Sequence, residues 1–183
     1  MRVFVSVLVL LAAAGAGFAY VQQTQPPWYE RLRYPLSYEQ IIRGHAQNYD
    51  LDPALLAAVI YRESKFDAGA KSSSGAIGLM QLLPETAKGI ALHTGGSRFM
   101  VSDLYNPEIN VRYGAFYLRR LLTKYDDTRL ALAAYNAGQA NVDAWRANGE
   151  GIVFPETREY VDSVLETRDV YADAYAKELG LDS

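Results

Sequence analysis

The stretch DPALLAAVIYRES, residues 52–64, decides the fold of this 183-residue chain. Asp52 can cap a helix, and Pro53 suits the first helical position because the first turn leaves its amide groups unpaired. The residues that follow are apolar around nearly the whole helix, so most of its surface must be buried. We therefore expect a mainly α-helical domain that surrounds this segment.

Helical patterns continue on both sides of this segment. Ser37 and Gln40 form a predicted capping box at the start of a helix that ends near residue 49. Asn106 followed by Pro107 repeats the cap-and-proline signal and predicts a long helix to about residue 125. Further helices are expected over residues 84–92, 128–136, 140–147 and 156–179. Only residues 76–83 could hold a very short β segment.

The first 21 residues form a predicted export segment. A positive start precedes an almost unbroken apolar run over residues 3–11, and small residues follow it. This order is typical of a cleavable signal peptide. Residues 3–21 taken together are also close to the length that spans a bilayer. Both interpretations place the rest of the chain outside the cytoplasm, either secreted or anchored by one N-terminal transmembrane helix that is inserted in the membrane.

Residues 22–36 form a predicted linker, because Pro26, Pro27 and Pro35 interrupt regular helix. The remaining residues, 37–183, form one predicted domain, which suits the size of a single core.

Composition excludes several classes of function. The formal net charge is -3 and no run of Lys or Arg is present, so we expect no nucleic-acid partner. The chain has no cysteine, which excludes disulfides, thiol nucleophiles and thiolate metal sites. Its two histidines, His45 and His93, lie far apart in the sequence. We therefore expect neither a metal nor another cofactor.

Glu63 is the first candidate for chemistry. It lies in the last turn of the apolar helix, where burial and the negative end of the helix dipole both disfavour a charged carboxylate. Both effects raise the carboxyl pKa, as a general acid at neutral pH requires. The alternative is an ordinary exposed carboxylate at a helix end.

Three further segments stand out. Residues 72–81, SSSGAIGLMQ, are rich in small residues that allow a ligand to approach the backbone closely. Residues 132–138, LAAYNAG, surround one tyrosine with small side chains. Residues 156–161, ETREYV, begin the last predicted helix. Each could instead be ordinary loop or core.

Together these segments resemble the signature of the soluble-type lytic transglycosylases, whose family 1 catalytic domain is related to goose-type lysozyme. The first motif comprises ESKF at 63–66, Ser72 and GAIGLMQLLPETA at 75–87; the second is AAYNAG at 133–138, and ETREYV is the third. The resemblance covers roughly residues 37–165. It implies a lysozyme-like helical catalytic domain over residues 37–183 that acts on peptidoglycan glycan strands as a monomer. One departure is Ala68, where members often carry proline.

The resemblance implies one catalytic residue and six residues that contact substrate. The catalytic glutamate falls on Glu63. The substrate-contacting residues fall on Ser72, Met80, Gln81, Tyr135, Asn136 and Glu156.

The mechanism that the resemblance implies needs only one carboxyl. Glu63 protonates the oxygen between N-acetylmuramic acid and N-acetylglucosamine, while the 2-acetamido group of the substrate stabilises the developing charge. Glu63 then accepts the proton of the muramic 6-hydroxyl, which closes a 1,6-anhydro ring. Tyr135 would position the acetamide or the Glu63 carboxyl. The alternatives are hydrolysis, as in goose-type lysozyme, and a non-catalytic wall-binding module.

Overall fold

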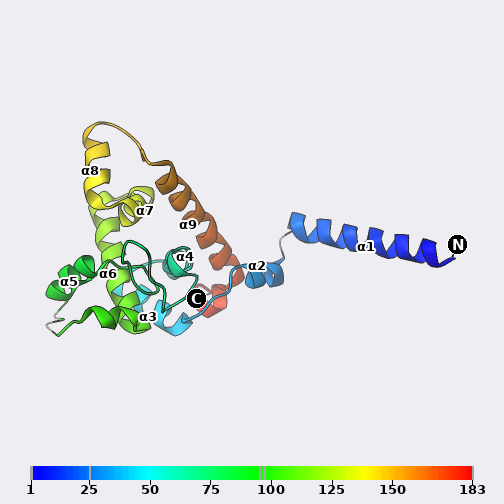
Figure 1. Ribbon diagram of the computed structural model, residues 1–183, viewed down its shortest axis with the longest axis horizontal. Coiled ribbons are helices and arrows are strands. Elements are labelled where there is room, and N and C mark those ends of the chain that lie inside the picture. Colours follow the sequence, from blue (N-terminus) through cyan, green and yellow to red (C-terminus); the bar gives the residue numbers. More distant parts are fainter. Residues whose placement is uncertain (1, 25, 95, 97, 183) are drawn as a thin grey trace. The chain divides into compact units, whose positions relative to one another are not determined.

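The computed structural model describes residues 2–24, 26–94, 96 and 98–182, and the chain divides into two compact units, Met1–Pro35 and Leu36–Ser183 (Figure 1). The first unit holds helices α1 (Arg2–Thr24) and α2 (Pro27–Arg33). Among the residues that the structure describes, none of the helices combines the length and the apolar character needed to cross a membrane.

The expectation that prolines keep residues 22–36 free of regular helix is wrong. Helix α1 continues to Thr24, and α2 begins at Pro27 itself. Proline is compatible with the first turn of a helix because its missing amide hydrogen would have no intrahelical acceptor there.

The regular elements described in the second unit are all helices, which confirms the mainly α fold. Its described residues contain isolated bridges, Lys71 with Ile77 and Ile77 with Leu82, but no strand. The elements are α3 (Glu39–Tyr49), α4 (Pro53–Ser64), α5 (Pro84–His93), the 3-10 helix η1 (Val101–Tyr105), α6 (Pro107–Tyr125), α7 (Thr128–Ala137), α8 (Gln139–Ala147), α9 (Pro155–Ala174) and α10 (Ala176–Leu179).

Two of the three predicted helix caps are confirmed. The Asp52 side chain accepts a hydrogen bond from the amide of Ala54 at 2.8 Å. Asn106 Oδ1 accepts from the first-turn amides of α6. The predicted capping box of Ser37 with Gln40 is wrong, because Tyr38 is the residue before the helix and adopts a left-handed conformation with φ 61° and no side-chain cap. The last predicted helix is also interrupted, at Tyr175.

Helix α4 forms the centre of the domain. Its residues from Ala54 to Tyr61 are all buried, and the helix packs against α3 and α9. Helix α6 packs against α3 and α7, so the two long helices α6 and α9 enclose the core (Figure 1). The burial predicted from the apolar sequence of α4 is therefore confirmed.

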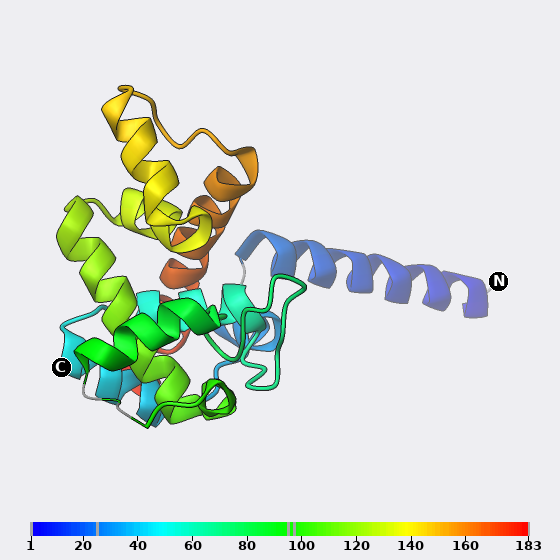
Figure 2. The same ribbon diagram turned by 60° about the vertical axis from the view of Figure 1, so that its left-hand side comes forward.

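The long loop after α4 is fixed by Asn110 of α6, which is fully buried. Asn110 Oδ1 accepts from the amide of Met80 at 2.8 Å, and its Nδ2 donates to the carbonyls of Ile77 at 2.9 Å and Leu104 at 2.8 Å. Gly78, with φ 79°, lies directly against Asn110 and leaves no room for a Cβ. Figure 2 shows the loop beside α4. One buried amide therefore holds a loop that contains almost no regular structure.

We expect Asn110→Ala to lower the free energy of unfolding by about 3 kcal/mol or more, because three buried backbone groups lose their partner. Urea denaturation measures the change. Asn148→Ala is the matched control, since Asn148 is exposed and its amide makes one long contact of 3.4 Å. Equal effects of the two substitutions would show that Asn110 does not hold the loop.

Candidate active site

Glu63 is half-buried in the last turn of α4, as the sequence predicted. Burial raises the pKa of its carboxyl from 4.5 to about 7, and a hydrogen bond from Tyr160 offsets part of this rise. A carboxyl with this pKa is protonated in a large fraction of molecules at neutral pH and also ionises readily. It can therefore act as an acid and then as a base.

Tyr160 of α9 is the direct partner of Glu63. Its hydroxyl donates to Glu63 Oε1 at 2.6 Å. Burial and the nearby Glu63 charge raise the pKa of Tyr160 well above its usual value, so the phenol stays a neutral donor. Because Oε1 accepts this hydrogen, the acidic proton of Glu63 belongs on Oε2.

Tyr160 lies within the third motif, but no role is predicted for it from the sequence. The periodicity of α9 carried a signal, because Tyr160 lies three residues after Thr157 and one before Val161, both buried. That pattern places Tyr160 at the margin of the buried face. It does not reveal that the face meets the end of α4.

Glu63 lies at a cleft of about 290 Å³. Its walls come from the end of α4, the loop after it, the start of α5, the middle of α6, the last turn of α7 and Gly138. The lining residues are Glu63, Ser74, Gln81, Leu82, Leu83, Thr86, Tyr117, Tyr135, Asn136, Ala137 and Gly138. Of the predicted site residues, the structure thus brings Glu63, Gln81, Tyr135 and Asn136 together.

Tyr135 lies in the cleft, but its hydroxyl contacts the protein backbone. The hydroxyl donates to the carbonyl of Met80 at 2.8 Å, and its ring lies 5.5 Å from that of Tyr117. Tyr135 was expected to position either the acetamide or the Glu63 carboxyl, and the hydrogen bond to Glu63 comes from Tyr160. With its own hydrogen engaged, the Tyr135 oxygen can only accept from a ligand.

Met80 does not present its side chain to the cleft, contrary to the expectation that it contacts a sugar. The side chain is fully buried against Gly114, where a Cβ would overlap the Met80 sulfur. Only the Met80 backbone carbonyl connects it to the site, through Tyr135. The apolar surface in the cleft comes instead from residues such as Leu83, which is 45% exposed.

Ser72 and Gln81 mainly organise the loop. Ser72 Oγ accepts from the amide of Ala76 at 3.0 Å and lies 2.8 Å from Ser74 Oγ, and Ser74 rather than Ser72 lines the cleft. Gln81 Nε2 donates to the carbonyls of Gly78 at 2.9 Å and Ala70 at 3.3 Å. The side-chain oxygen of Gln81 is therefore the atom with which it can meet a ligand.

Asn136 and Glu156 have different environments. Asn136 Oδ1 accepts from Thr157 Oγ1 at 2.9 Å, which ties the end of α7 to the start of α9. Glu156 is exposed in the first turn of α9 and is not among the residues that line the cleft. Its position before Thr157 suits a favourable charge at a helix N-terminus.

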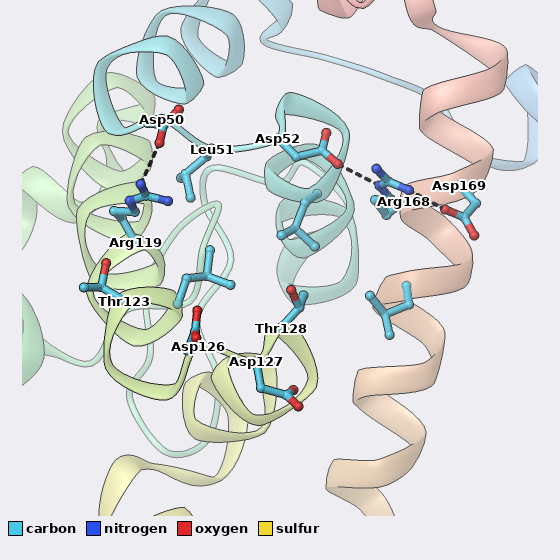
Figure 3. Close-up of a pocket in the computed structure, with 13 residues that line it drawn as sticks. Asp50, Leu51, Asp52, Arg119, Thr123, Asp126, Asp127, Thr128, Arg168 and Asp169 are labelled. Carbon is cyan, nitrogen blue, oxygen red and sulfur yellow. Dashed lines mark hydrogen bonds and ion pairs between the residues drawn. The ribbon is translucent and has the colours of Figure 1, made fainter.

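A larger cavity of about 880 Å³ lies near the other end of α4 (Figure 3). Its two arginines are paired, Arg119 with Asp50 at 2.6 Å and Arg168 with Asp52 at 2.7 Å. Size alone does not make it the functional site, because the ion pairs engage the charged groups of Asp50 and Asp52. Among the described residues, no cluster of three or more acidic or histidine side chains could hold a metal ion.

The fold and the site define a helical domain with a half-buried carboxyl acid, Glu63, in a cleft lined by polar and apolar residues. The chain belongs to the family described as the transglycosylase SLT domain, whose profile matches residues 40–151.

Relatives of known name support this assignment. The soluble lytic murein transglycosylase of Salmonella typhimurium is 34% identical over 150 residues, which cover 73% of this chain and 22% of that protein. A solved structure of an inactive mutant of the lytic transglycosylase Slt from Pseudomonas aeruginosa is 33% identical, with a TM-score of 0.74 over 84% of this chain and 26% of that one. The 70 kDa soluble lytic transglycosylase of Escherichia coli is 29% identical, with a TM-score of 0.75 over 85% and 27%.

This chain therefore spans about a quarter of the length of these relatives. The lysozyme-like helical fold is confirmed by the structural similarity.

We expect Tyr160→Phe to raise the pKa of Glu63 further, by roughly one unit, because the hydrogen bond that favours the carboxylate is lost. A carbon-13 NMR titration of the Glu63 carboxyl measures it. Tyr105→Phe, at an exposed tyrosine, should leave the titration unchanged. A pKa that stays near 7 in Tyr160→Phe would contradict the role of this bond.

Glu63→Gln should stabilise the protein above neutral pH. The pKa is about 7 in the folded chain and 4.5 ordinarily, so the unfolded chain ionises first and stability falls as the pH rises between these values. Glutamine avoids this penalty, which is about 3 kcal/mol above pH 7.

Thermal denaturation of wild type and Glu63→Gln at about pH 4 and about pH 8 measures this difference. The two proteins should differ only at the higher pH. Glu166→Gln, at an exposed position of α9, serves as the control and should show no such pH dependence. A wild type as stable as Glu63→Gln at the higher pH would show that Glu63 ionises without a penalty.

Proposed function

We propose that this domain is a peptidoglycan lytic transglycosylase. It cleaves the β-1,4 bond between N-acetylmuramic acid and N-acetylglucosamine and leaves a 1,6-anhydro end. The observation that carries the proposal is a single carboxyl, that of Glu63, with a pKa of about 7 in the cleft. The family of the chain and the names of its relatives point to the same reaction.

A lone carboxyl favours this reaction over two-carboxylate hydrolysis. Common glycosidases place a second carboxyl about 5 to 9.5 Å from the first. Glu63 is the one carboxyl-bearing residue among those described as lining the cleft. Asp67 is exposed in the loop, where it accepts from the amide of Gly69, and Glu85 pairs with Lys88. An internal nucleophile from the substrate then replaces the missing second group.

The contacts of Glu63 assign its two oxygens. Tyr160 donates to Oε1, so Oε2 carries the proton that passes to the glycosidic oxygen. The same carboxyl, now ionised, accepts the proton of the muramic 6-hydroxyl as that oxygen bonds to C1. The first step needs a protonated carboxyl and the second an ionised one. A pKa of about 7 makes both forms accessible near neutral pH.

The hydrogen-bond acceptors of the cleft suit N-acetylated sugars. The Tyr135 oxygen accepts an acetamide N–H, which turns the acetamide oxygen toward C1 to stabilise the developing charge. Gln81 offers a second acceptor, and Asn136 keeps its amide donors because its oxygen is bound to Thr157. Ser72 holds the side chain of Ser74, which lines the cleft. Leu83 provides the apolar contact with the sugar that was expected from Met80. Glu156 has no direct role in this arrangement.

The cellular setting follows from the substrate. Residues 1–21 direct export, and the mature domain acts outside the cytoplasm, either released or retained by its N-terminal segment. The domain works as a monomer on glycan strands.

Mass analysis of purified peptidoglycan digested with wild type and Glu63→Gln tests the proposal. Wild type should release muropeptides lighter by one water than hydrolysis products, and Glu63→Gln should lose at least about a thousandfold in rate. Activity should fall as the pH rises above about 7, where Glu63 loses its proton.

Reducing-end muramic acid as the sole product would identify a hydrolase instead. Undiminished biological activity of Glu63→Gln would indicate a wall-binding module. Circular dichroism of the variant establishes that its fold is retained.

A further inference from the structure

The turn between α7 and α8 forms one wall of the cleft. Residues 136–138 line the cleft, and α8 begins immediately afterwards at Gln139. Helix α8 packs against α7, and its buried residues are Val142 and Trp145. Trp145 also packs edge-on against Phe154, with the ring centroids 4.9 Å apart. These apolar contacts and the polar contacts of α8 together place the cleft wall.

The backbone at this turn does not fix the direction of α8. Gly138 is the single residue between the two helices, and it has φ 87° and ψ 147°. Such angles are essentially restricted to glycine, which populates many conformations. Side-chain contacts must hold α8 in place.

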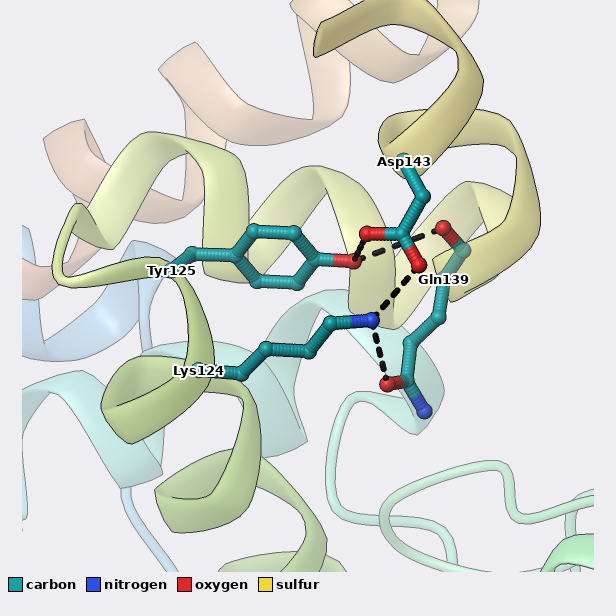
Figure 4. Close-up of polar contacts among 4 residues, drawn as sticks. All are labelled: Lys124, Tyr125, Gln139 and Asp143. Carbon is teal, nitrogen blue, oxygen red and sulfur yellow. Dashed lines mark hydrogen bonds and ion pairs between the residues drawn. The ribbon is translucent and has the colours of Figure 1, made fainter. Parts of the chain in front are cut away.

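Four residues of α6 and α8 supply these contacts, and we name them the α6–α8 clamp: Lys124, Tyr125, Gln139 and Asp143 (Figure 4). Lys124 Nζ donates to Asp143 Oδ2 at 2.6 Å and to Gln139 Oε1 at 3.2 Å. The Tyr125 hydroxyl lies 3.0 Å from Asp143 Oδ1 and 3.4 Å from the Gln139 carbonyl, and it is the donor in both contacts. The clamp thus holds the residue that directly follows Gly138.

The clamp acts opposite a second anchor. On the other side of the turn, Thr157 of α9 donates to Asn136. The start of α8 is therefore bound to α6, and the end of α7 is bound to α9. Neither anchor includes Glu63 or Tyr160, so the wall and the acid are held by separate contacts.

The charges of the clamp persist across the pH range in which Glu63 titrates. The Lys124 ammonium holds the pKa of Asp143 below its usual value, and Asp143 raises that of Lys124. Burial raises the pKa of Tyr125, so its hydroxyl remains a donor. A change in the clamp should therefore not alter how activity depends on pH.

We propose that Lys124, Tyr125 and Asp143 are positioning residues that set the width of the cleft and thereby its affinity for the glycan strand. This inference rests on the proposed function. The clamp residues are not among those that line the cleft, so their effect passes through the α7–α8 turn.

Lys124→Met and Asp143→Ala should each raise KM for soluble glycan strands roughly threefold to tenfold, with kcat within about twofold of wild type. The fall in kcat/KM with rising pH should stay centred near pH 7, since Glu63 keeps its environment. Lys124→Arg keeps the charge and should restore most of the affinity. Arg119→Met is the matched control: it also removes a 2.6 Å ion pair from α6, to Asp50, and should leave KM unchanged.

Hydrogen exchange gives a second measurement on the folded protein. The amides of Gly138 and Gln139 should exchange faster in Lys124→Met than in Arg119→Met. A KM and exchange rates equal to those of Arg119→Met would overturn the inference, as would a loss of kcat accompanied by a shifted pH profile. If wild type itself releases no anhydro product, the proposed function fails and the inference falls with it. A cleaving wild type with an unaffected Lys124→Met overturns the inference alone.

Discussion

The burial of α4 is the constraint on which the site depends. Its apolar residues can leave water only if α3 and α9 cover the helix, and this packing also surrounds the carboxyl at its end. Glu63 therefore loses part of its hydration, and its pKa rises to about 7. The helix that covers α4 brings Tyr160 with it, so one packing interaction supplies both the desolvation and the hydrogen bond that moderates it. The acid is a consequence of how the core is built.

In the rest of the cleft, hydrogen bonds within the protein decide which donors and acceptors remain available to a ligand. Asn110 fixes the loop from inside, and this places the Met80 carbonyl where Tyr135 can donate to it. Tyr135 and Gln81 consequently have only acceptor oxygens left to offer a ligand, because their own hydrogens are already bound. The N–H of an acetamide group, such as that of an amino sugar, complements these acceptors. The α6–α8 clamp and Thr157 then hold the opposite wall.

Several features were predictable because they depend on local sequence. The caps at Asp52 and Asn106 need only a side chain near its own helix start, and the position of Glu63 follows from counting along an apolar helix. The prediction for Met80 was wrong because burial depends on Gly114, thirty-four residues away, whose missing Cβ admits the side chain. Tyr160 was missed for a similar reason, since its partner lies 97 residues earlier in the chain. Nothing near either residue in the sequence records these neighbours.

By itself, the sequence determined the helical class, the central helix and the identity of the candidate acid, because periodicity and capping act over a few residues. The first two motifs also contain Glu63, Gln81, Tyr135 and Asn136, the predicted site residues that line the cleft. Only the tertiary structure decided which atoms face the cleft. In the structure, Tyr160 rather than Tyr135 donates a hydrogen bond to Glu63. Met80 lies in the core, and Glu156 lies on the surface. The physical reason is that pKa values, burial and hydrogen-bond partners depend on groups that meet only when distant helices pack.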